Sequence, residues 1–298
     1  MTWKENLIGL YLYISDSKSI KKHLQGMRQS NNTTTEFTDE EVMTLYLFGI
    51  HKNLYKVKHI HQYAKAHLSD WFPKLPSYQA FDNRLNQLGG AFAIMTEELI
   101  SKGCDRLTFT IESLIDSMPV IVAGNKRSSF AKTASDICNK GFCASKNMYY
   151  YGLKLHLIGF VRPSTIPMPE YCWFTSAEAN DLTAAKDILG NIYNRKIFGD
   201  KIYFVEEYNK KLFNENNSLI ISPIKKTKGQ ILQDAADNLY STAVSAIRQP
   251  VESFFNWINE KTQIQNATKV RSSKGLLVHV WGKLAAVLAL LTITIFNP

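Results

Sequence analysis

The 298-residue chain carries 35 lysine and arginine residues against 26 aspartate and glutamate residues, which gives a formal net charge of +9. Its hydrophobic fraction of 45%, with 12% aromatic residues, is enough for a sizeable buried core, so the composition excludes a disordered chain. A basic excess of this size favours an anionic partner, and nucleic acid is the most frequent one.

The cysteines and the apolar segments indicate a cytoplasmic protein. No two of the four cysteines (Cys104, Cys138, Cys143 and Cys172) have C-x-x-C spacing, so free thiols are favoured over a zinc site. The N-terminal sequence MTWKENLIGLYLYISDSKSI lacks the long apolar core and cleavage site of a signal peptide. The apolar run LAAVLALLTITIF has 13 residues, too few to span a membrane, and predicts a buried helix. We therefore expect no membrane association.

Residues 1–104 are predicted to form a helical domain. In FTDEEVMTLYLFGI, Thr38 is the expected N-cap and Glu41, three residues later, completes a capping box. A further helix is expected to begin after Ser77. Residues 51–67 hold four lysines, four histidines and no acidic residue, in spacings that match no metal-binding motif. Such a basic helical layer suits phosphate contact, so this domain is expected to bind DNA.

From Leu107 onward the pattern changes to alternating strands and helices. Segments rich in β-branched and aromatic residues predict five strands, and the segments between or after them predict helices. The expected strands are 107–123, 146–160, 170–179, 195–204 and 218–224, and the expected helices are 180–193, 205–217 and 241–264. Three consecutive strands followed by alternation predict an α/β domain over residues 105–298, with a mixed five-stranded sheet flanked by helices.

Three carboxylates lie among apolar neighbours in these segments. Asp116 lies in the first expected strand, Asp200 lies in the fourth, and Glu252 lies in the last long helix. A buried carboxylate shifts its pKa or is paired, and convergence on divalent cations would offset the cost of burial. Mg²⁺ prefers oxygen ligands, so carboxylates are suited to hold it.

Each acid taken alone has a structural alternative. These alternatives are a turn cap at Asp116, an ion pair of Asp200 with Lys201 or Lys154, and an ion pair of Glu252 with Arg248. The order of the three acids favours a shared site, because the first and fourth strands of a ribonuclease H-like sheet are neighbours.

The chain resembles the DDE transposases of bacterial insertion sequences. The resemblance covers residues 105–298 and is carried by the segments LIDSMPV, YYYGLKLHLI, FTSAEANDLTAAKDIL, IFGDKIY and RQPVESFFNWI. It implies a ribonuclease H-like fold in which Asp116, Asp200 and Glu252 hold two Mg²⁺ ions, for which Mn²⁺ can substitute. The resemblance also implies double-stranded DNA as the partner, both as transposon ends and as target, with a homodimer in the DNA complex.

Related enzymes carry a Y-R-E-K signature around the glutamate. Arg248 and Glu252 match it, whereas Ser245 and Asn259 stand at the positions of the tyrosine and the lysine. Arg248 and Lys154 are the first candidates for phosphate contact. Asn180 or Asp181 is expected to cap the helix at 180–193, and the alternative role for Asp181 is to support the metal ligands.

Residues 120–154 hold six basic residues against one acid, Asp136. Lys126, Arg127 and Lys132 are the expected DNA contacts, because basic groups neutralise phosphates. Aromatic residues lie between these charges and suit stacking on unpaired bases. The alternative is a solvated loop. A second basic stretch, PIKKTKGQ at 223–230, is a further candidate contact.

These features predict a metal-dependent transposase that cleaves DNA at transposon ends and joins the 3′-OH to a target. Two alternatives remain at this stage: a ribonuclease H-like nuclease without strand transfer, and a non-catalytic domesticated DNA-binding protein. The three acids argue against the second alternative.

Overall fold

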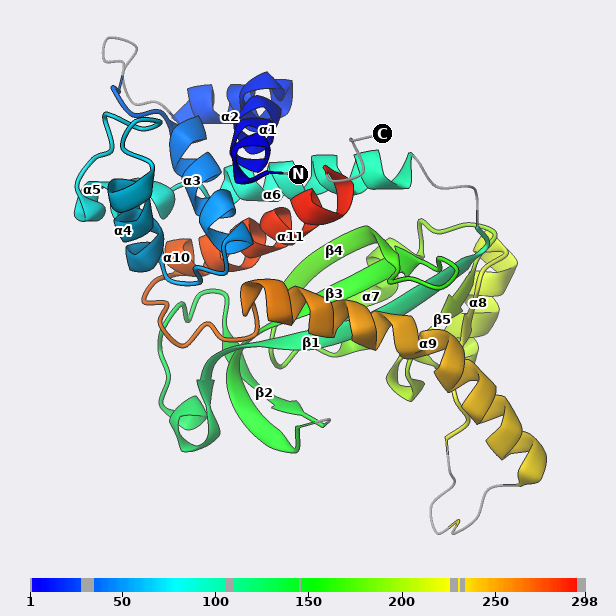
Figure 1. Ribbon diagram of the computed structural model, residues 1–298. Helices are drawn as coiled ribbons and strands as arrows, with labels where there is room; N and C mark the ends of the chain where they lie inside the picture. Colours follow the sequence, from blue (N-terminus) through cyan, green and yellow to red (C-terminus); the bar gives the residue numbers. More distant parts are fainter. Residues whose placement is uncertain are drawn as a thin grey trace. The chain divides into compact units, whose positions relative to one another are not determined.

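The computed structural model describes residues 2–27, 35–105, 110–144, 146–225, 230 and 234–293. The chain divides into two compact units (Figure 1). Unit 1 comprises Met1–Gly103 and Ile258–Pro298, and unit 2 comprises Cys104–Trp257.

Unit 1 is built from helices. From the N-terminus these are α1 (Trp3–Asp16), α2 (Lys18–Met27), α3 (Asp39–His51), α4 (Val57–His67), α5 (Tyr78–Leu85) and α6 (Gly89–Cys104). Thr38 and Glu41 form the expected capping box at the start of α3, and Ser77 caps α5, so both predicted helix starts are confirmed. Helix α3 is buried without interruption from Val42 to Ile50, which makes it the central helix of this unit.

The C-terminal helices belong to the same unit. They are α10 (Ser273–Leu277), the π-helical turn η3 (Val278–Gly282) and α11 (Lys283–Thr292), and α11 packs against α3. Together they form the one helix, among the described residues, that is long and apolar enough to cross a membrane, and 72% of its apolar window is buried. The expected buried helix is therefore present. The sequence grouped this segment with the sheet, whereas in the structure it packs among the helices of unit 1. An all-apolar helix requires contacts on every side, and the helices of unit 1 provide such contacts.

Unit 2 is a curled mixed sheet with helices on both faces, consistent with a ribonuclease H-like fold. Its strands are β1 (Glu112–Gly124), β2 (Asn139–Cys143), β3 (Met148–Phe160), β4 (Met168–Ser176), β5 (Lys196–Phe198) and β6 (Leu219–Ile221). Strands β2 and β4 pair with successive parts of β3, β3 pairs with β1, and β1 is followed by β5 and β6. Pairs within β1–β4 are antiparallel, whereas β1–β5 and β5–β6 are parallel. The expected adjacency of the first and fourth predicted strands is confirmed.

The sheet has one strand more than predicted. Strand β2 lies in the basic segment that the sequence marks as a connection, after the 3₁₀ helix η1 (Asn125–Ser129). Its residues alternate, since Gly141 and Cys143 are buried while Lys140 and Phe142 are exposed. This is the pattern of a half-buried strand, but five residues with a glycine and two polar side chains give too weak a signal.

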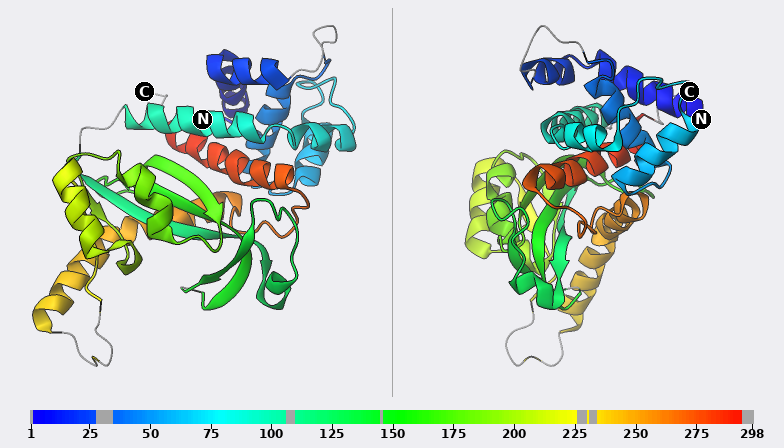
Figure 2. Two further views of the ribbon diagram at one scale, coloured as in Figure 1. Left: turned by 180° about the vertical axis from the view of Figure 1, so that it is seen from behind. Right: turned by 90° about the vertical axis from the view of Figure 1, so that its left-hand side faces the viewer.

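Helices cover both faces of this sheet (Figure 2). Helices α7 (Asp181–Leu189) and α8 (Glu206–Asn216) lie on one face, and their apolar side chains share a core cluster with Ile115 and Ile158. Helix α9 (Ala235–Thr262) lies across the opposite face (Figure 1). Because successive side chains of a strand point to opposite faces, Asp116 points to the α9 side.

Candidate active site

The pairing of β1 with β5 brings two of the predicted acids to one edge of the sheet. Leu114 lies opposite Phe198 in this parallel pair. Asp116 is two residues past Leu114 and Asp200 is two residues past Phe198, so both side chains lie just beyond the point where β1 and β5 stop pairing. Strand β5 ends there, whereas β1 continues to Gly124 beside β3. Side chains beyond the carboxyl end of a parallel pair are free to face a ligand instead of the core.

Asp200 does not lie inside a strand, which corrects the prediction for residues 195–204. Strand β5 ends at Phe198, and Asp200 is the N-cap of the short 3₁₀ helix η2 (Lys201–Tyr203). Its carboxylate accepts a 2.7 Å hydrogen bond from the Lys201 amide and is 53% exposed. Gly199 makes the turn possible, because a Cβ there would lie 2.7 Å from a methyl group of Ile115. The turn therefore presents the carboxylate at the surface of the sheet edge.

Helix α9 delivers Arg248 to these two acids. Its buried residues Val244, Arg248, Val251 and Phe255 recur at helical spacing, so the arginine takes a position in an otherwise apolar stripe. The helix runs unbroken from Ala235 to Thr262 through Pro250, so it begins earlier than the expected residue 241. Arg248 is thus fixed by packing on both sides along the helix.

The Arg248 guanidinium pairs with both aspartates. Its Nη2 lies 3.4 Å from Asp116 Oδ2 and its Nη1 lies 3.8 Å from Asp200 Oδ1. Within the described part of the chain its ion pairs are with these two residues and not with Glu252, which argues against the simple pair expected from i, i+4 spacing. The Nε atom is buried and has no hydrogen-bond partner among the described residues, so the guanidinium retains a donor for a ligand.

The three predicted acids act on one another electrostatically. The pKa of Asp116 is raised to about 6, chiefly by burial and also by the charges of Asp200 and Glu252, while Arg248 and the Ser117 amide oppose the rise. The side chain of Asp116 is only 21% exposed, while Glu252 on α9 is exposed. The structure therefore gathers two of these acids around one arginine and brings the charge of the third within reach.

The donor set matches a hard divalent cation in its chemistry. Carboxylate oxygens are the ligands that Mg²⁺ prefers, and a buried carboxylate with a raised pKa gains most from a nearby cation. Among the residues that the structure describes, no three His, Cys, Asp or Glu side chains form a ready-made metal cluster. In their present geometry Arg248 is the cation that Asp116 and Asp200 share.

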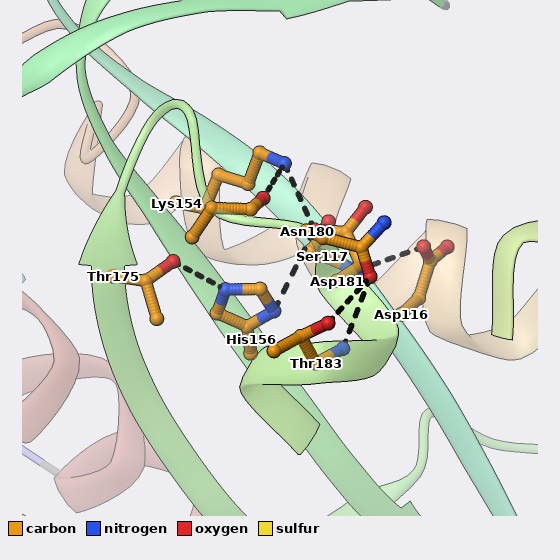
Figure 3. Close-up of polar contacts among 9 residues, drawn as sticks. Asp116, Ser117, Lys154, His156, Thr175, Asn180, Asp181 and Thr183 are labelled. Atoms are coloured by element: carbon orange, nitrogen blue, oxygen red, sulfur yellow. Dashed lines mark hydrogen bonds and ion pairs between the residues drawn. The ribbon is translucent and has the colours of Figure 1, made fainter. Parts of the chain in front are cut away.

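Lys154 lies in a separate polar cluster on the α7 side of the sheet (Figure 3). Its ammonium donates to Asp181 Oδ1 at 3.0 Å and to the Ala179 carbonyl at 2.7 Å, and both charged side chains are largely buried. His156 donates to or accepts from Thr175 at 2.7 Å, and burial lowers its pKa to about 4. Asn180, not Asp181, caps α7, which corrects the capping role expected for the aspartate.

The predicted DNA contacts in the β1–β3 region are solvent-exposed. Lys126 and Arg127 lie on η1, and Lys132 follows in the connection before β2. Among the described residues, none of the three forms an ion pair with Asp116 or Asp200. Of the second basic stretch, residues 226–229 lie outside the described residues.

The sequence did not single out Tyr203 as a site residue. It is buried in η2, and its hydroxyl has no hydrogen-bond partner that meets normal geometry among the described residues. Burial raises its pKa well above the ordinary value, and the charges of Asp116 and Asp181 add to the effect. In the sequence, Tyr203 lies three residues after Asp200 in an apolar run, which is typical of a core residue. Only the fold shows that it lies near Asp116 and Asp181.

The order of the strands and the flanking helices are consistent with the ribonuclease H-like fold class. A family model described as a transposase DDE domain matches residues 107–273, more than half of the chain. The chain belongs to the transposase DDE domain family. DDE transposase domains act on DNA and generally use divalent metal ions. Neither the curated proteins nor the solved structures include a significant match.

Proposed function

We propose that this transposase cleaves DNA at transposon ends and transfers the 3′-OH into target DNA, at a site formed by Asp116, Asp200 and Glu252. The observation that carries the proposal is the shared environment of the three acids: two converge on Arg248, and the third raises the pKa of the first. A buried carboxylate with a perturbed pKa, close to other charged groups, is typical of functional sites.

The three carboxylates are proposed to hold Mg²⁺, with two ions and with Mn²⁺ as a substitute. Bound divalent cations would supply charge neutralisation at the scissile phosphate and would lower the pKa of an attacking water molecule. Asp116, which is buried, supplies a fixed negative charge from the sheet, and Asp200 supplies one from the exposed turn after β5. Glu252 adds the third from α9, one helical turn after Arg248.

Arg248 is proposed to orient the phosphate. A guanidinium forms two parallel hydrogen bonds with a phosphate, and its planar geometry fixes the orientation of that group. The buried Nε donor, which has no hydrogen-bond partner among the described residues, supports this role. Lys154 was the second candidate for phosphate contact. Its pairing with Asp181 supports a structural role for it instead, as the ion pair that fixes the start of α7 against β3.

Cleavage of labelled DNA that carries the inverted repeats flanking the gene tests the proposal. Asp116→Asn, Asp200→Asn and Glu252→Gln each remove a charge with little change in volume, so each variant is expected to fold and to cleave about a thousandfold more slowly. Glu207→Gln, at an exposed position of α8, is the matched control and should cleave normally. Wild-type cleavage by any of the three variants would remove that residue from the site.

Strand transfer distinguishes the proposal from the nuclease alternative. A pre-cleaved end with a free 3′-OH should be joined to plasmid DNA by the wild type and not by the three variants. Cleavage without joined products would identify a nuclease. DNA binding that persists without either reaction would identify a non-catalytic DNA-binding protein. We further propose a homodimer on the DNA and a cytoplasmic location.

A further inference from the structure

The β2–β3 hairpin exposes an unusual group of aromatic side chains. Tyr149 and Phe142 lie opposite each other in the antiparallel pair, with ring centroids 5.0 Å apart. They are 57% and 48% exposed, and Phe130, just after η1, is 83% exposed. Three large rings in solvent are costly for a monomeric protein and indicate a binding surface.

The opposite face of the same hairpin is packed. Cys143 and Tyr150 are buried there together with Ala177, which follows β4. A Cβ at Gly141 would lie 2.1 Å from the Ala177 carbonyl oxygen, so the hairpin backbone lies directly against that segment. The exposed rings are therefore held on a supported sheet face and not on a loose loop.

Basic side chains surround these rings. The Lys140 ammonium lies 4.9 Å from the centre of the Tyr149 ring and donates a 2.9 Å hydrogen bond to Ser129. That bond joins the hairpin to η1, which carries Lys126 and Arg127. The combined surface of Lys126, Arg127, Phe130, Lys140, Phe142 and Tyr149 is called the aromatic-basic platform below.

We propose that the aromatic-basic platform binds unpaired bases of the DNA substrate. A duplex keeps the faces of its bases stacked, so it would contact the lysines but leave the three rings in water. An unpaired base offers a free face to an aromatic ring, and the basic neighbours neutralise its phosphates. A protein partner fits less well, because the cores of protein interfaces are depleted in lysine. The inference rests on the proposed function in taking DNA as the substrate.

Binding of fluorescent oligonucleotides in EDTA tests the platform without cleavage. The probes are a blunt duplex, the same duplex with an unpaired tail, and a single strand. Phe142→Ala and Tyr149→Ala should each weaken binding of the tailed and single-stranded probes about tenfold, while binding of the blunt duplex changes less than about twofold. Phe142→Tyr and Tyr149→Phe keep a ring and should bind as the wild type does. Melting temperatures confirm that each variant is folded.

A second readout follows stacking directly. With 2-aminopurine in the tail, the wild type should quench its fluorescence, and the alanine variants should not. If the alanine variants bound each probe as tightly as the wild type does, the proposal would be overturned. It would also be overturned if the alanine variants lost the same factor of affinity for the blunt duplex as for the tailed duplex. The cleavage assay with the acid variants is independent of both readouts. Failure of the platform therefore leaves the proposed active site standing, and failure of the active site leaves the platform result unchanged.

Discussion

At Arg248 a single guanidinium faces two carboxylates, and its chemistry decides what the site can do. A lysine ammonium is a point charge and cannot pair with Asp116 and Asp200 while keeping a further donor in a fixed plane. Arg248→Lys should therefore fold with a near-normal melting temperature but lose cleavage and binding of transposon ends together. Cleavage and end binding are measured on the same DNA. Full activity of the lysine variant would reduce Arg248 to a structural counter-ion.

Asp116 gives the metal-free protein a distinctive pH dependence. The pKa of Asp116 is raised from 3.8 to about 6 in the native state. Between these two pH values, the carboxyl group is mostly protonated in the native state and mostly ionised in the unfolded state. Its stabilising contribution is complete below about pH 4 and is lost as the pH rises through 6. The loss is on the order of 3 kcal/mol, because one pKa unit corresponds to roughly 1.4 kcal/mol. Arg248, Asp200 and Glu252 are the charges that set this value.

Chemical denaturation of Asp116→Asn in EDTA measures this contribution. The asparagine variant should be more stable than the wild type at pH 8, and the difference should shrink as the pH falls towards 4. The carboxylate is destabilising in the metal-free fold, which is common for catalytic groups. A difference between the two proteins that is the same at pH 4.5 and pH 8 would show that Asp116 has an ordinary pKa.

Among the helices and strands, the sequence correctly predicted the features that depend on hydrophobic periodicity and on capping residues. The capping box at Thr38 and the adjacency of the first and fourth strands were both predicted correctly, since each depends on short-range patterns or on the fold class. The predicted end of β5 was wrong. Ile202 and Tyr203 continue an apolar run, but the run turns at Gly199 because the chain has no room for a side chain beside Ile115. That restriction comes from a neighbouring strand, and a single glycine in an apolar run does not by itself distinguish a turn from a bulge within a strand.

The turn after β5 offers a test that leaves every acid in place. Gly199→Ala would put a methyl group 2.7 Å from the Ile115 side chain and 3.2 Å from the Tyr203 ring, so η2 must move and carry Asp200 with it. We expect cleavage to fall about a hundredfold, because a displacement of about 1 Å has that effect on a catalytic group. Gly190→Ala, where the nearest atom to the added methyl group would lie 3.4 Å away, is the control. Normal cleavage by Gly199→Ala would show that the position of Asp200 is not critical.

At the scale of the whole molecule, the net charge of +9 is useful only where it is placed. Lys126, Arg127 and Lys132 are exposed and, among the described residues, have no ion pairs, whereas Lys210 and Lys211 on α8 are paired with Glu206 and Glu215. Lys126, Arg127 and Lys132 are therefore expected to contact DNA phosphates. Lysines that are already paired with acidic residues neutralise fewer phosphates, so they release fewer counterions from the DNA.

Salt dependence of DNA binding tests this placement. Replacing the three unpaired residues by glutamine should weaken binding and reduce the slope of log affinity against log salt by about 0.9 for each phosphate that the protein no longer neutralises. Glutamine at Lys210 and Lys211 is the control and should leave the slope nearly unchanged. An unchanged slope in the triple variant would place the DNA path elsewhere on the protein.

The grouping of the chain into units was the least accessible feature of the sequence. The segment from Ile258 onward shares no motif with the N-terminal helices, yet α11 packs against α3. An apolar helix indicates that it is buried but not what buries it, because many apolar surfaces are equivalent in composition. The proximity of Asp116 and Asp200 was expected from their order along the chain, whereas the pairing of Arg248 with both aspartates required the structure.

A change of metal preference at Asp200 tests the central claim, that the three acids hold the catalytic metal ions. A thiolate is a poor ligand for Mg²⁺ but binds softer ions, so Asp200→Cys should lose cleavage with Mg²⁺ and recover much of it with Mn²⁺. The wild type and Asp187→Cys, an exposed position on α7, should cleave with both metals. If the three acids hold the metal ions, Mn²⁺ should selectively restore cleavage in Asp200→Cys alone. Normal cleavage by that variant with Mg²⁺, or no recovery beyond the response of the wild type to Mn²⁺, would contradict it.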